Sequence, residues 1–285
     1  MRVTSLCNLG SINLDAYVKS QDKAKLAKTI VKMLDSTVVN NHHQLESAKP
    51  TTKYAFIGVG VCNLAYVLAQ QGLPMDSQQA SEYIDALFDD LSYNIISASN
   101  ELAKKYGPFE NWENTKWFNS LPILESRKHF PSVWNLTEYG RNFNLDRWMD
   151  LQEQIKKYGI RNATLMAIAP TSRSSKVINN TPSIEPVLNT KVIEENTTSV
   201  ISTVPGFGEV EYSLAFDCDQ KMLIQNTAIM QKYVDQAISH TIFLNTNSMR
   251  KIHELHKFGF DNGVKTFYYL KQRKQDYDEC GSCVV

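Results

Sequence analysis

The sequence lacks the features that mark secreted, membrane and nucleic-acid-binding proteins. Its 30 basic and 30 acidic residues balance, so no overall charge favours binding to a nucleic acid or a membrane surface. The most apolar stretch, residues 54–69, contains two glycines and Asn63 and is too short for a membrane span. No N-terminal signal-peptide pattern is visible. We therefore expect a soluble, cytoplasmic protein, whose 42% hydrophobic and 21% charged residues are typical of a folded globular chain.

Cysteine is also scarce, and its placement is unusual. The five cysteines form an odd set without a secretory signal, which argues against a disulfide framework. Two of them, Cys280 and Cys283, form a Cys-x-x-Cys pair within the last six residues. Such a pair can be a structural disulfide, half of a zinc site, or a pair of thiols that exchange with external disulfides. Because neither a second pair nor a downstream histidine is present, we favour the redox pair and expect no metal site.

Hydrophobic periodicity predicts helices separated by short buried strands, the pattern of an α/β layered or barrel protein. Helices are expected at 22–39, 77–107, 145–159, 222–240 and 248–260. Residues 54–72 are expected to form a short buried strand or turn that runs into a helix ending near Gly72, with Cys62 on an apolar helix face. Short strands are expected near 162–169 and at 264–272, with a β-rich or loop segment at 198–213. Residues 109–144 are rich in Trp, Asn and Pro and predict an irregular surface excursion. We treat 1–270 as one folded unit and 271–285 as a flexible tail.

A Ser/Thr-rich loop after the strand near 162–169 is a candidate phosphate site. Small hydroxyl residues let backbone N–H groups approach an anion, and a following helix N-terminus adds positive potential. No Walker motif is present, and the alternative is an ordinary serine-rich helix cap. The candidate residues are Thr171, Ser172, Arg173, Ser174 and Ser175.

Two other features each have an ordinary structural explanation as well as a functional one. Tyr268 and Tyr269 are adjacent in a predicted strand, where one ring ordinarily faces inward and the other outward. The functional alternative is a pair of phenols that pass an electron and a proton. Cys7 lies in an apolar stretch and is, by default, a buried and inert thiol, as are Cys62 and Cys218.

Six motifs in order resemble the C-terminal half of the large, catalytic subunit of class I ribonucleotide reductase. The resemblance spans nearly the whole chain and rests on SLCNLGSINL, GVGVCNLAYVLAQQG and SASNELAKKYG, then IRNATLMAIAPTSRSSKVINNTPSIEP, IMQKYVDQAIS and NGVKTFYYLKQR. The terminal Cys-x-x-Cys pair closes the match. The resemblance implies the second half of a ten-stranded α/β barrel of the ribonucleotide reductase type, followed by a flexible C-terminal tail.

The resemblance also implies a role for each candidate residue. Cys7 becomes one half of the active-site dithiol, in a chamber of low exposure. Tyr268 and Tyr269 become the large subunit's end of a radical-transfer chain, and Thr171 to Ser175 become the cradle of the substrate phosphates. Cys280 and Cys283 become a swinging arm that reduces the active-site disulfide and is itself reduced by thioredoxin or glutaredoxin. The radical comes from the metal centre of a separate small subunit, so no cofactor is expected on this chain, and the substrate is a nucleoside diphosphate.

The sequence departs from the family pattern in two ways. Ser172 and Arg173 stand where the family frequently has an acidic residue and a threonine before the paired serines, so the contacts of the phosphate loop differ. The family's radical cysteine lies in an Asn-x-Cys-x-Glu stretch upstream of the SLCNLGSINL region, and no such stretch is present. We therefore expect either a split large subunit, of a kind best known from phages, whose N-terminal half is supplied in trans, or a fragment from an interrupted gene.

Two alternatives remain open from the sequence. A fragment of a cobalamin-dependent reductase would also contain CNLGSINL, but it would not need the tyrosine pair, because cobalamin generates the radical locally. A non-catalytic remnant or binding module is the second alternative. The presence of Cys7, both tyrosines and both tail cysteines in one chain argues against decay.

Overall fold

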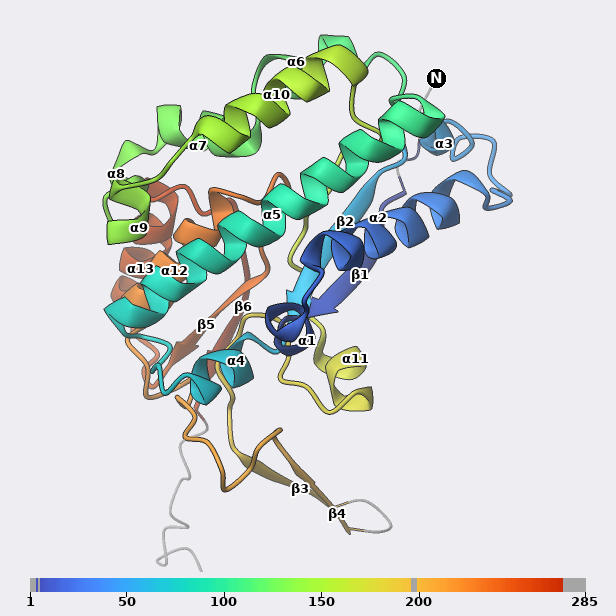
Figure 1. Ribbon diagram of the computed structural model, residues 1–285. Coiled ribbons are helices and arrows are strands. Elements are labelled where there is room, and N and C mark those ends of the chain that lie inside the picture. Colours follow the sequence, from blue (N-terminus) through green and yellow to red (C-terminus); the bar gives the residue numbers. More distant parts are fainter. Residues whose placement is uncertain (1–3, 5, 196–198, 274–285) are drawn as a thin grey trace, which may run out of the picture.

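The computed structural model describes residue 4 and residues 6–195 and 199–273, arranged as helices around a twisted sheet (Figure 1). The strands are β1 (Asn8–Asn13), β2 (Ile57–Cys62), β3 (Lys191–Glu195), β4 (Ser199–Thr203), β5 (His240–Leu244) and β6 (Phe267–Gln272). The helices are α1 (Leu14–Lys19), α2 (Lys23–Val39), α3 (Thr51–Tyr54), α4 (Leu64–Gln70), α5 (Gln78–Tyr106), α6 (Lys116–Asn119), α7 (Pro122–His129), α8 (Pro131–Trp134), α9 (Glu138–Arg141), α10 (Asp146–Tyr158), α11 (Ser172–Val177), α12 (Gln220–Gln231) and α13 (Met249–Asp261), with a 3-10 turn at Trp112–Asn114.

The sheet is parallel and open. β1 pairs with β2, and β5 pairs with β6, both in parallel register. Residues 164–168 join the two pairs: they bond to β2 through Val59 N and Leu165 O at 2.7 Å, and to residues 237–239 through Ile168 N and Ala237 O at 3.2 Å. The resulting order is β1, β2, 164–168, 236–244 and β6. Within the described residues β1 and β6 are open edges, while β3 and β4 form a separate antiparallel hairpin.

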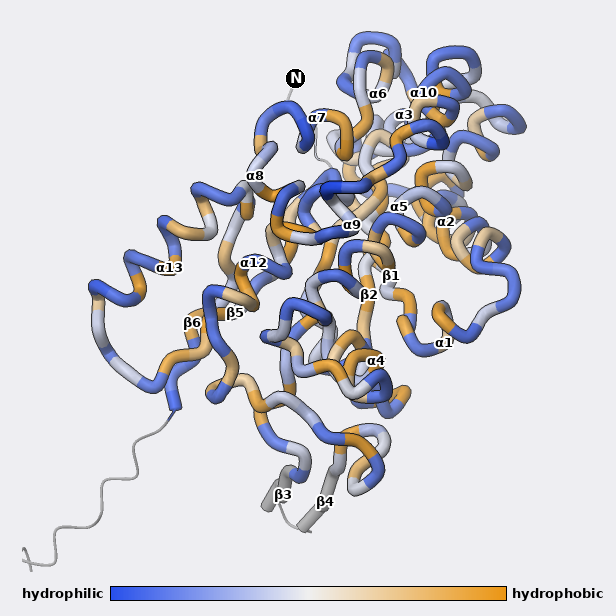
Figure 2. The backbone as a smooth tube through the Cα atoms, turned by 60° about the vertical axis from the view of Figure 1, so that its left-hand side comes forward, coloured by the Kyte–Doolittle hydropathy of each residue, from blue (hydrophilic) through white to orange (hydrophobic). Residues whose placement is uncertain are grey.

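Helices cover one face of this sheet. A side chain at Gly10 would lie 3.3 Å from Leu34 of α2, which places α2 against β1, and α5 packs in turn on α2, α10 and α12. All six residues of β2 are buried, as a strand of a covered parallel sheet requires. Figure 2 shows α13 at the periphery with alternating hydrophilic and hydrophobic residues, the pattern of a surface helix. Among the helices described, none combines the length and apolar character that crossing a membrane would need.

Three expectations about local structure are wrong. Residues 109–144 are not a surface excursion, because their short helices insert Trp112, Trp117 and Trp134 into the hydrophobic core. Cys62 ends strand β2 and is not on a helix face. The helix expected at 222–240 stops at Gln231, and the chain then turns into the sheet. The carboxylate of Asp235 accepts hydrogen bonds from the backbone N–H groups of residues 165 and 166, so pairing with the sheet overrides local helix propensity.

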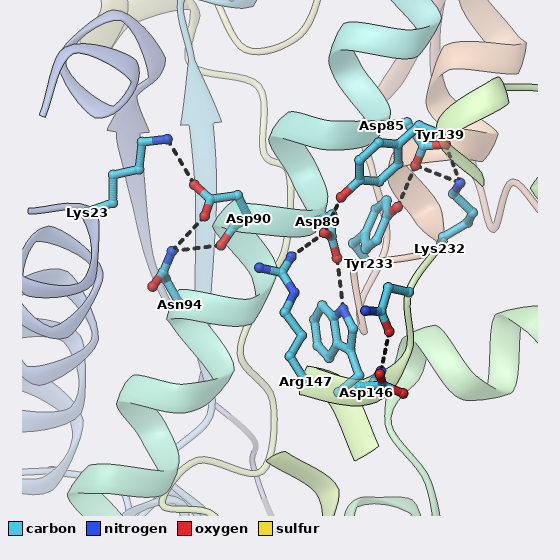
Figure 3. A network of polar contacts seen from close by, with 12 residues as sticks. Lys23, Asp85, Asp89, Asp90, Asn94, Tyr139, Asp146, Arg147, Lys232 and Tyr233 are labelled. Atoms are coloured by element: carbon cyan, nitrogen blue, oxygen red, sulfur yellow. Dashed lines mark hydrogen bonds and ion pairs between the residues drawn. The ribbon is translucent and has the colours of Figure 1, made fainter. Parts of the chain in front are cut away.

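A buried polar network fixes α5 against α12, next to the chain that leads into β5 (Figure 3). Asp85 on α5 and Lys232 just after α12 are both fully buried, with Lys232 Nζ 2.6 Å from Asp85 Oδ1. Thr137 and Tyr233 also donate hydroxyl hydrogen bonds to the Asp85 carboxylate. Burial lowers the pKa of Lys232, and the carboxylate partner opposes that change. The network therefore tolerates the loss of both charges better than the loss of one.

Lys232→Met is expected to destabilise the protein by about 3–5 kcal/mol, because it leaves the Asp85 carboxylate buried without its cation. The double variant Asp85→Asn with Lys232→Met should lose clearly less than the sum of the two single changes. Lys257→Met, which removes an equally short but exposed ion pair with Asp261, should cost under about 1 kcal/mol. Urea unfolding followed by the fluorescence of Trp134, which stacks under Lys232 Nζ at 4.5 Å, measures all three. Equal costs for the buried and exposed pairs would contradict this assignment.

Candidate active site

The face of the sheet opposite α2 carries the candidate redox residue and two glycines. By alternation along β1, Leu9 and Ser11 point away from α2, on the same side as Gly58 and Gly60 of β2. A side-chain carbon at Gly58 would lie 2.5 Å from Leu9 Cδ2, and one at Gly60 would lie 2.6 Å from the carbonyl oxygen of Ala167. Gly60 has no room for a side chain, because the backbone of residues 167–168 lies against it, whereas a side chain at Gly58 would require the exposed Leu9 side chain to move.

Cys7 lies at the N-terminal end of β1 on this glycine-lined face. A side chain at Gly58 would come within 3.5 Å of its Sγ, and the thiol is 3.8 Å from Gln236 Oε1. Partial loss of hydration raises the pKa of the Cys7 thiol, a change that its side-chain interactions with Thr164 and Gln236 oppose, so the S–H form dominates at neutral pH. The expected low exposure is wrong in this structure: Cys7 is exposed, because β1 is an edge strand within the described residues and Leu9 beside it is 56% exposed.

Two residues beside Cys7 were not singled out from the sequence. Gln236 Nε2 donates to the carbonyl of Ile57 at 2.9 Å, which holds its side chain between the strands and directs Oε1 toward the thiol. Asp235 is partly buried, and loss of hydration raises the pKa of its carboxyl to about 6, a change that hydrogen bonds from the backbone N–H groups of residues 165 and 166 oppose. Both belong to the VDQAIS stretch, which the sequence reasoning used as a motif without assigning its members.

The Ser/Thr-rich loop lies at the C-terminal ends of the strands, where α11 follows the segment 164–168. Thr171 and Ser175 are buried, and both are engaged in the loop's own structure. Thr171 Oγ1 accepts from Ser183 N at 2.7 Å, and Ser175 Oγ donates to the carbonyl of Thr171 at 2.6 Å. Ser172, Arg173 and Ser174 are exposed. Ser174 Oγ also donates to the carbonyl of Thr171, at 3.3 Å, so three of the five candidates brace the loop internally.

Asn63 braces this loop from the end of β2, and the sequence reasoning gave it no such role. It has a left-handed backbone, with φ 76°, and its Oδ1 accepts from Thr181 N at 2.9 Å while its Nδ2 donates to Asn13 Oδ1 at 3.1 Å. Asn179 and Ser183 in the loop also have positive φ values of 52° and 48°. Non-glycine residues in this conformation concentrate at ligand-binding sites. The signal available in the sequence was an asparagine directly after a buried strand, since asparagine adopts this conformation more readily than most residues.

The two tyrosines lie on β6 and their rings are in contact. The ring centroids of Tyr268 and Tyr269 are 4.0 Å apart with an interplanar angle of 53°. The ladder explains this arrangement: His240 pairs with Phe267 but Thr241 pairs with Tyr269, so Tyr268 is the extra residue of a β-bulge. The expectation of one ring inward and one outward is therefore wrong, because the bulge interrupts the alternation and redirects a side chain. Both phenols are about half exposed, at 45% and 53%.

The candidate residues share one sheet but do not form one cluster. Cys7 directly precedes edge strand β1, the tyrosine pair is on edge strand β6, and the loop lies at the strand ends between them. β6 runs to Gln272, so its last two residues belong to the segment 271–285 that we expected to be the tail. Cys280 and Cys283 lie outside the described residues. Among the residues described, no group of three or more His, Cys, Asp or Glu side chains could hold a metal ion.

Comparison with known proteins assigns the family. The family model "Ribonucleotide reductase, barrel domain" matches residues 2–207 and 201–270. The chain belongs to the ribonucleotide reductase barrel-domain family. It is 34% identical over 283 residues to the ribonucleoside-diphosphate reductase subunit alpha of Helicobacter pylori (strain J99), a match that covers 97% of this chain and 36% of that protein.

Other ribonucleotide reductase relatives show the same partial coverage. The subunit alpha of Treponema pallidum is 26% identical over 286 residues, covering 98% of this chain and 32% of that protein. The NrdEB subunit alpha of Bacillus phage SPbeta is 28% identical over 295 residues, covering 98% of this chain and 27% of that protein. The chain thus spans about a third of the length of these curated relatives. The family expected from the motifs is confirmed, as is a mixed α/β structure with the sheet of a partial barrel.

Proposed function

We propose that this chain is the C-terminal part of the catalytic barrel of a ribonucleoside-diphosphate reductase, which makes deoxyribonucleotides for DNA synthesis. The observation that carries the proposal is the contact between the Tyr268 and Tyr269 rings at the β-bulge. An ordinary strand would place adjacent side chains on opposite faces. The bulge instead brings the two phenols together, as electron and proton transfer between them requires, although the packing of the strand does not need this contact. The shared sheet with Cys7 and the braced loop supports the same function.

The reaction replaces the 2′-hydroxyl group of the ribose with hydrogen. Two thiols supply the reducing equivalents, and the products are the deoxyribonucleotide, one disulfide and one water. Cys7 provides one of these thiols, present as S–H because its pKa is raised, and the second comes from the remainder of the subunit. The exposed Ser172, Arg173 and Ser174, with the backbone N–H groups at the start of α11, bind the substrate phosphates.

Tyr268 and Tyr269 receive the radical from a small subunit that carries the metal centre, and they pass it toward the radical cysteine of the other half. Cys280 and Cys283 then reduce the active-site disulfide by thiol–disulfide exchange, and thioredoxin or glutaredoxin restores them. The tail sequence supports a mobile carrier, because residues 274–279, most of which are charged, form a polar linker before the cysteine pair.

The N-terminal half supplies the strands that complete a ten-stranded barrel, and we propose that it is a separate chain. Two observations support the need for an N-terminal half: β1 and β6 have open edges in the described residues, and the 285 residues contain no Asn-x-Cys-x-Glu stretch. Leu6, just before β1, and Leu9 on β1 are exposed apolar side chains that such a partner would cover.

Reconstitution tests this function. The chain alone is expected to be inactive and to self-associate, and a chain carrying the Asn-x-Cys-x-Glu stretch should form a stable complex with it that buries more than ~2,000 Å². Adding the small subunit, a reductant and a nucleoside diphosphate should then yield deoxynucleotide. Size-exclusion chromatography and a reductase assay on each chain and on the mixture measure both effects. Activity from this chain alone, or a stable monomer that ignores its partner, would contradict the proposal.

A further inference from the structure

A mostly buried carboxylate contacts both β6, the strand that holds the tyrosine pair, and its neighbour β5. Glu185 follows the phosphate loop, and its side chain is only 14% exposed. Its Oε1 accepts a hydrogen bond from the hydroxyl of Thr241 on β5, and its Oε2 lies 3.6 Å from Lys271 Nζ on β6. Glu185 therefore contacts both strands of the β5–β6 pair from a third segment of the chain.

The contact falls where the ladder changes register. Thr241 is the partner of Tyr269, the first pair after the bulge at Tyr268, and Lys271 is two residues further along β6 on the same face as Tyr269. Lys271 Nζ also lies 5.4 Å from the centre of the Phe243 ring, which places it over β5. A bulge is a local loss of pairing, so a side chain that bonds to both strands beside it fixes the direction in which the bulged residue points.

We propose that Glu185 is a positioning residue for the tyrosine pair: its carboxylate clamps β5 to β6 beside the bulge and keeps the two phenol rings in contact. This inference rests on the proposed relay function of the tyrosines and deepens it. Because Glu185 and the phosphate-binding residues belong to one segment, 171–186, the clamp also links the place where the substrate binds to the place where the radical enters.

The electrostatics of the tyrosines support the clamp. The pKa of Tyr268 is raised, first by its hydrogen bond with Tyr269, then by desolvation, and further by the negative charges of Tyr269 and Glu185. The Tyr268 phenol therefore rests in the O–H form. Lys271 faces Glu185, and the nearest other cation at the end of β6, Arg273, is paired with Asp217 at 2.8 Å.

The test compares two carboxylates: that of Glu185, which contacts β6, and that of Asp217, which contacts the residue just after β6. Glu185→Gln keeps an acceptor for Thr241 but removes the charge, whereas Asp217→Asn removes the ion pair with Arg273 at the end of β6. Fluorotyrosine placed at position 268 of the full chain, in complex with its N-terminal half, reports the phenol titration by ¹⁹F NMR. We expect Glu185→Gln to lower the pKa of this phenol and Asp217→Asn to leave it unchanged. In the reconstituted enzyme, Glu185→Gln should lower kcat by ~10- to 100-fold with little change in KM.

Each outcome decides the matter. An unchanged titration in Glu185→Gln, or an equal change in Asp217→Asn, would overturn the clamp even if the tyrosines carry the radical. Full activity of the Tyr268→Phe enzyme would overturn the relay, and with it the positioning role, whatever the titration shows. A fall in kcat accompanied by a lower phenol pKa in Glu185→Gln alone is the result that the proposal requires.

Discussion

Replacing Tyr268 or Tyr269 with phenylalanine is expected to abolish reductase activity while leaving the fold intact. Phenylalanine keeps the ring and its packing but has no O–H group, so it cannot lose a proton and an electron at a comparable potential. Both rings are about half exposed on β6, and loss of their hydroxyls should change stability by less than about 0.5 kcal/mol. Activity should fall by at least about 100-fold, equivalent to ~3 kcal/mol in the barrier.

The matched control is Tyr158→Phe, which removes the hydroxyl of another exposed tyrosine on α10, outside the sheet. Steady-state assays of the reconstituted enzyme, with circular dichroism as a check of folding, separate the three variants. If either strand variant kept substantial activity, the relay role at that position would be wrong. Activity without either hydroxyl would favour the cobalamin-dependent alternative, in which the radical is generated locally.

Replacing Cys280 or Cys283 with serine is expected to stop repeated turnover driven by thioredoxin or glutaredoxin. Each turnover oxidises the active-site dithiol, and without the Cys-x-x-Cys pair the protein reductants have no carrier to that disulfide. A small dithiol should partly rescue the variants, because it can reach the active site directly. The expected result is one turnover per enzyme with thioredoxin and many with the small dithiol.

Cys62→Ser and Cys218→Ser are the controls for the tail variants. Both cysteines are buried, and burial raises the pKa of each thiol, that of Cys218 to about 12, so neither exchanges readily. Multiple turnover with thioredoxin should survive both changes. Thioredoxin-driven turnover at the wild-type rate in a variant lacking both tail cysteines would rule out the shuttle.

The sequence predicted the family and the main elements because those depend on local patterns. α2, α5, α10 and α13 follow apolar periodicities and caps that the residues carry themselves, such as the serine that precedes α5 and the glycine that ends it. The buried strand β2 was visible as a short apolar run with two glycines. Residue types at fixed spacing also identified Cys7, the Ser/Thr-rich loop and the tyrosines as candidates.

The remaining features depend on contacts between distant segments, which periodicity does not encode. The bulge at Tyr268 arises from the register between β5 and β6, and the early end of α12 arises from the bonds of Asp235 to residues 165 and 166. Glu185 looked like one polar residue in a loop until the fold placed it beside Thr241 and Lys271. The burial of the tryptophans in 109–144 was hidden for the same reason, because composition alone does not show which surface a short helix covers.

The most direct test of the central claim, that two chains share one active site, is the fate of Cys7 after a single turnover. The reconstituted enzyme, carrying serine at both positions 280 and 283, would be given one equivalent of nucleoside diphosphate without external reductant. Peptide mapping under non-reducing conditions should then find Cys7 in a disulfide with a cysteine of the N-terminal chain, in proportion to the deoxynucleotide formed and only when substrate is present. Deoxynucleotide formation with Cys7 still a free thiol would contradict the account.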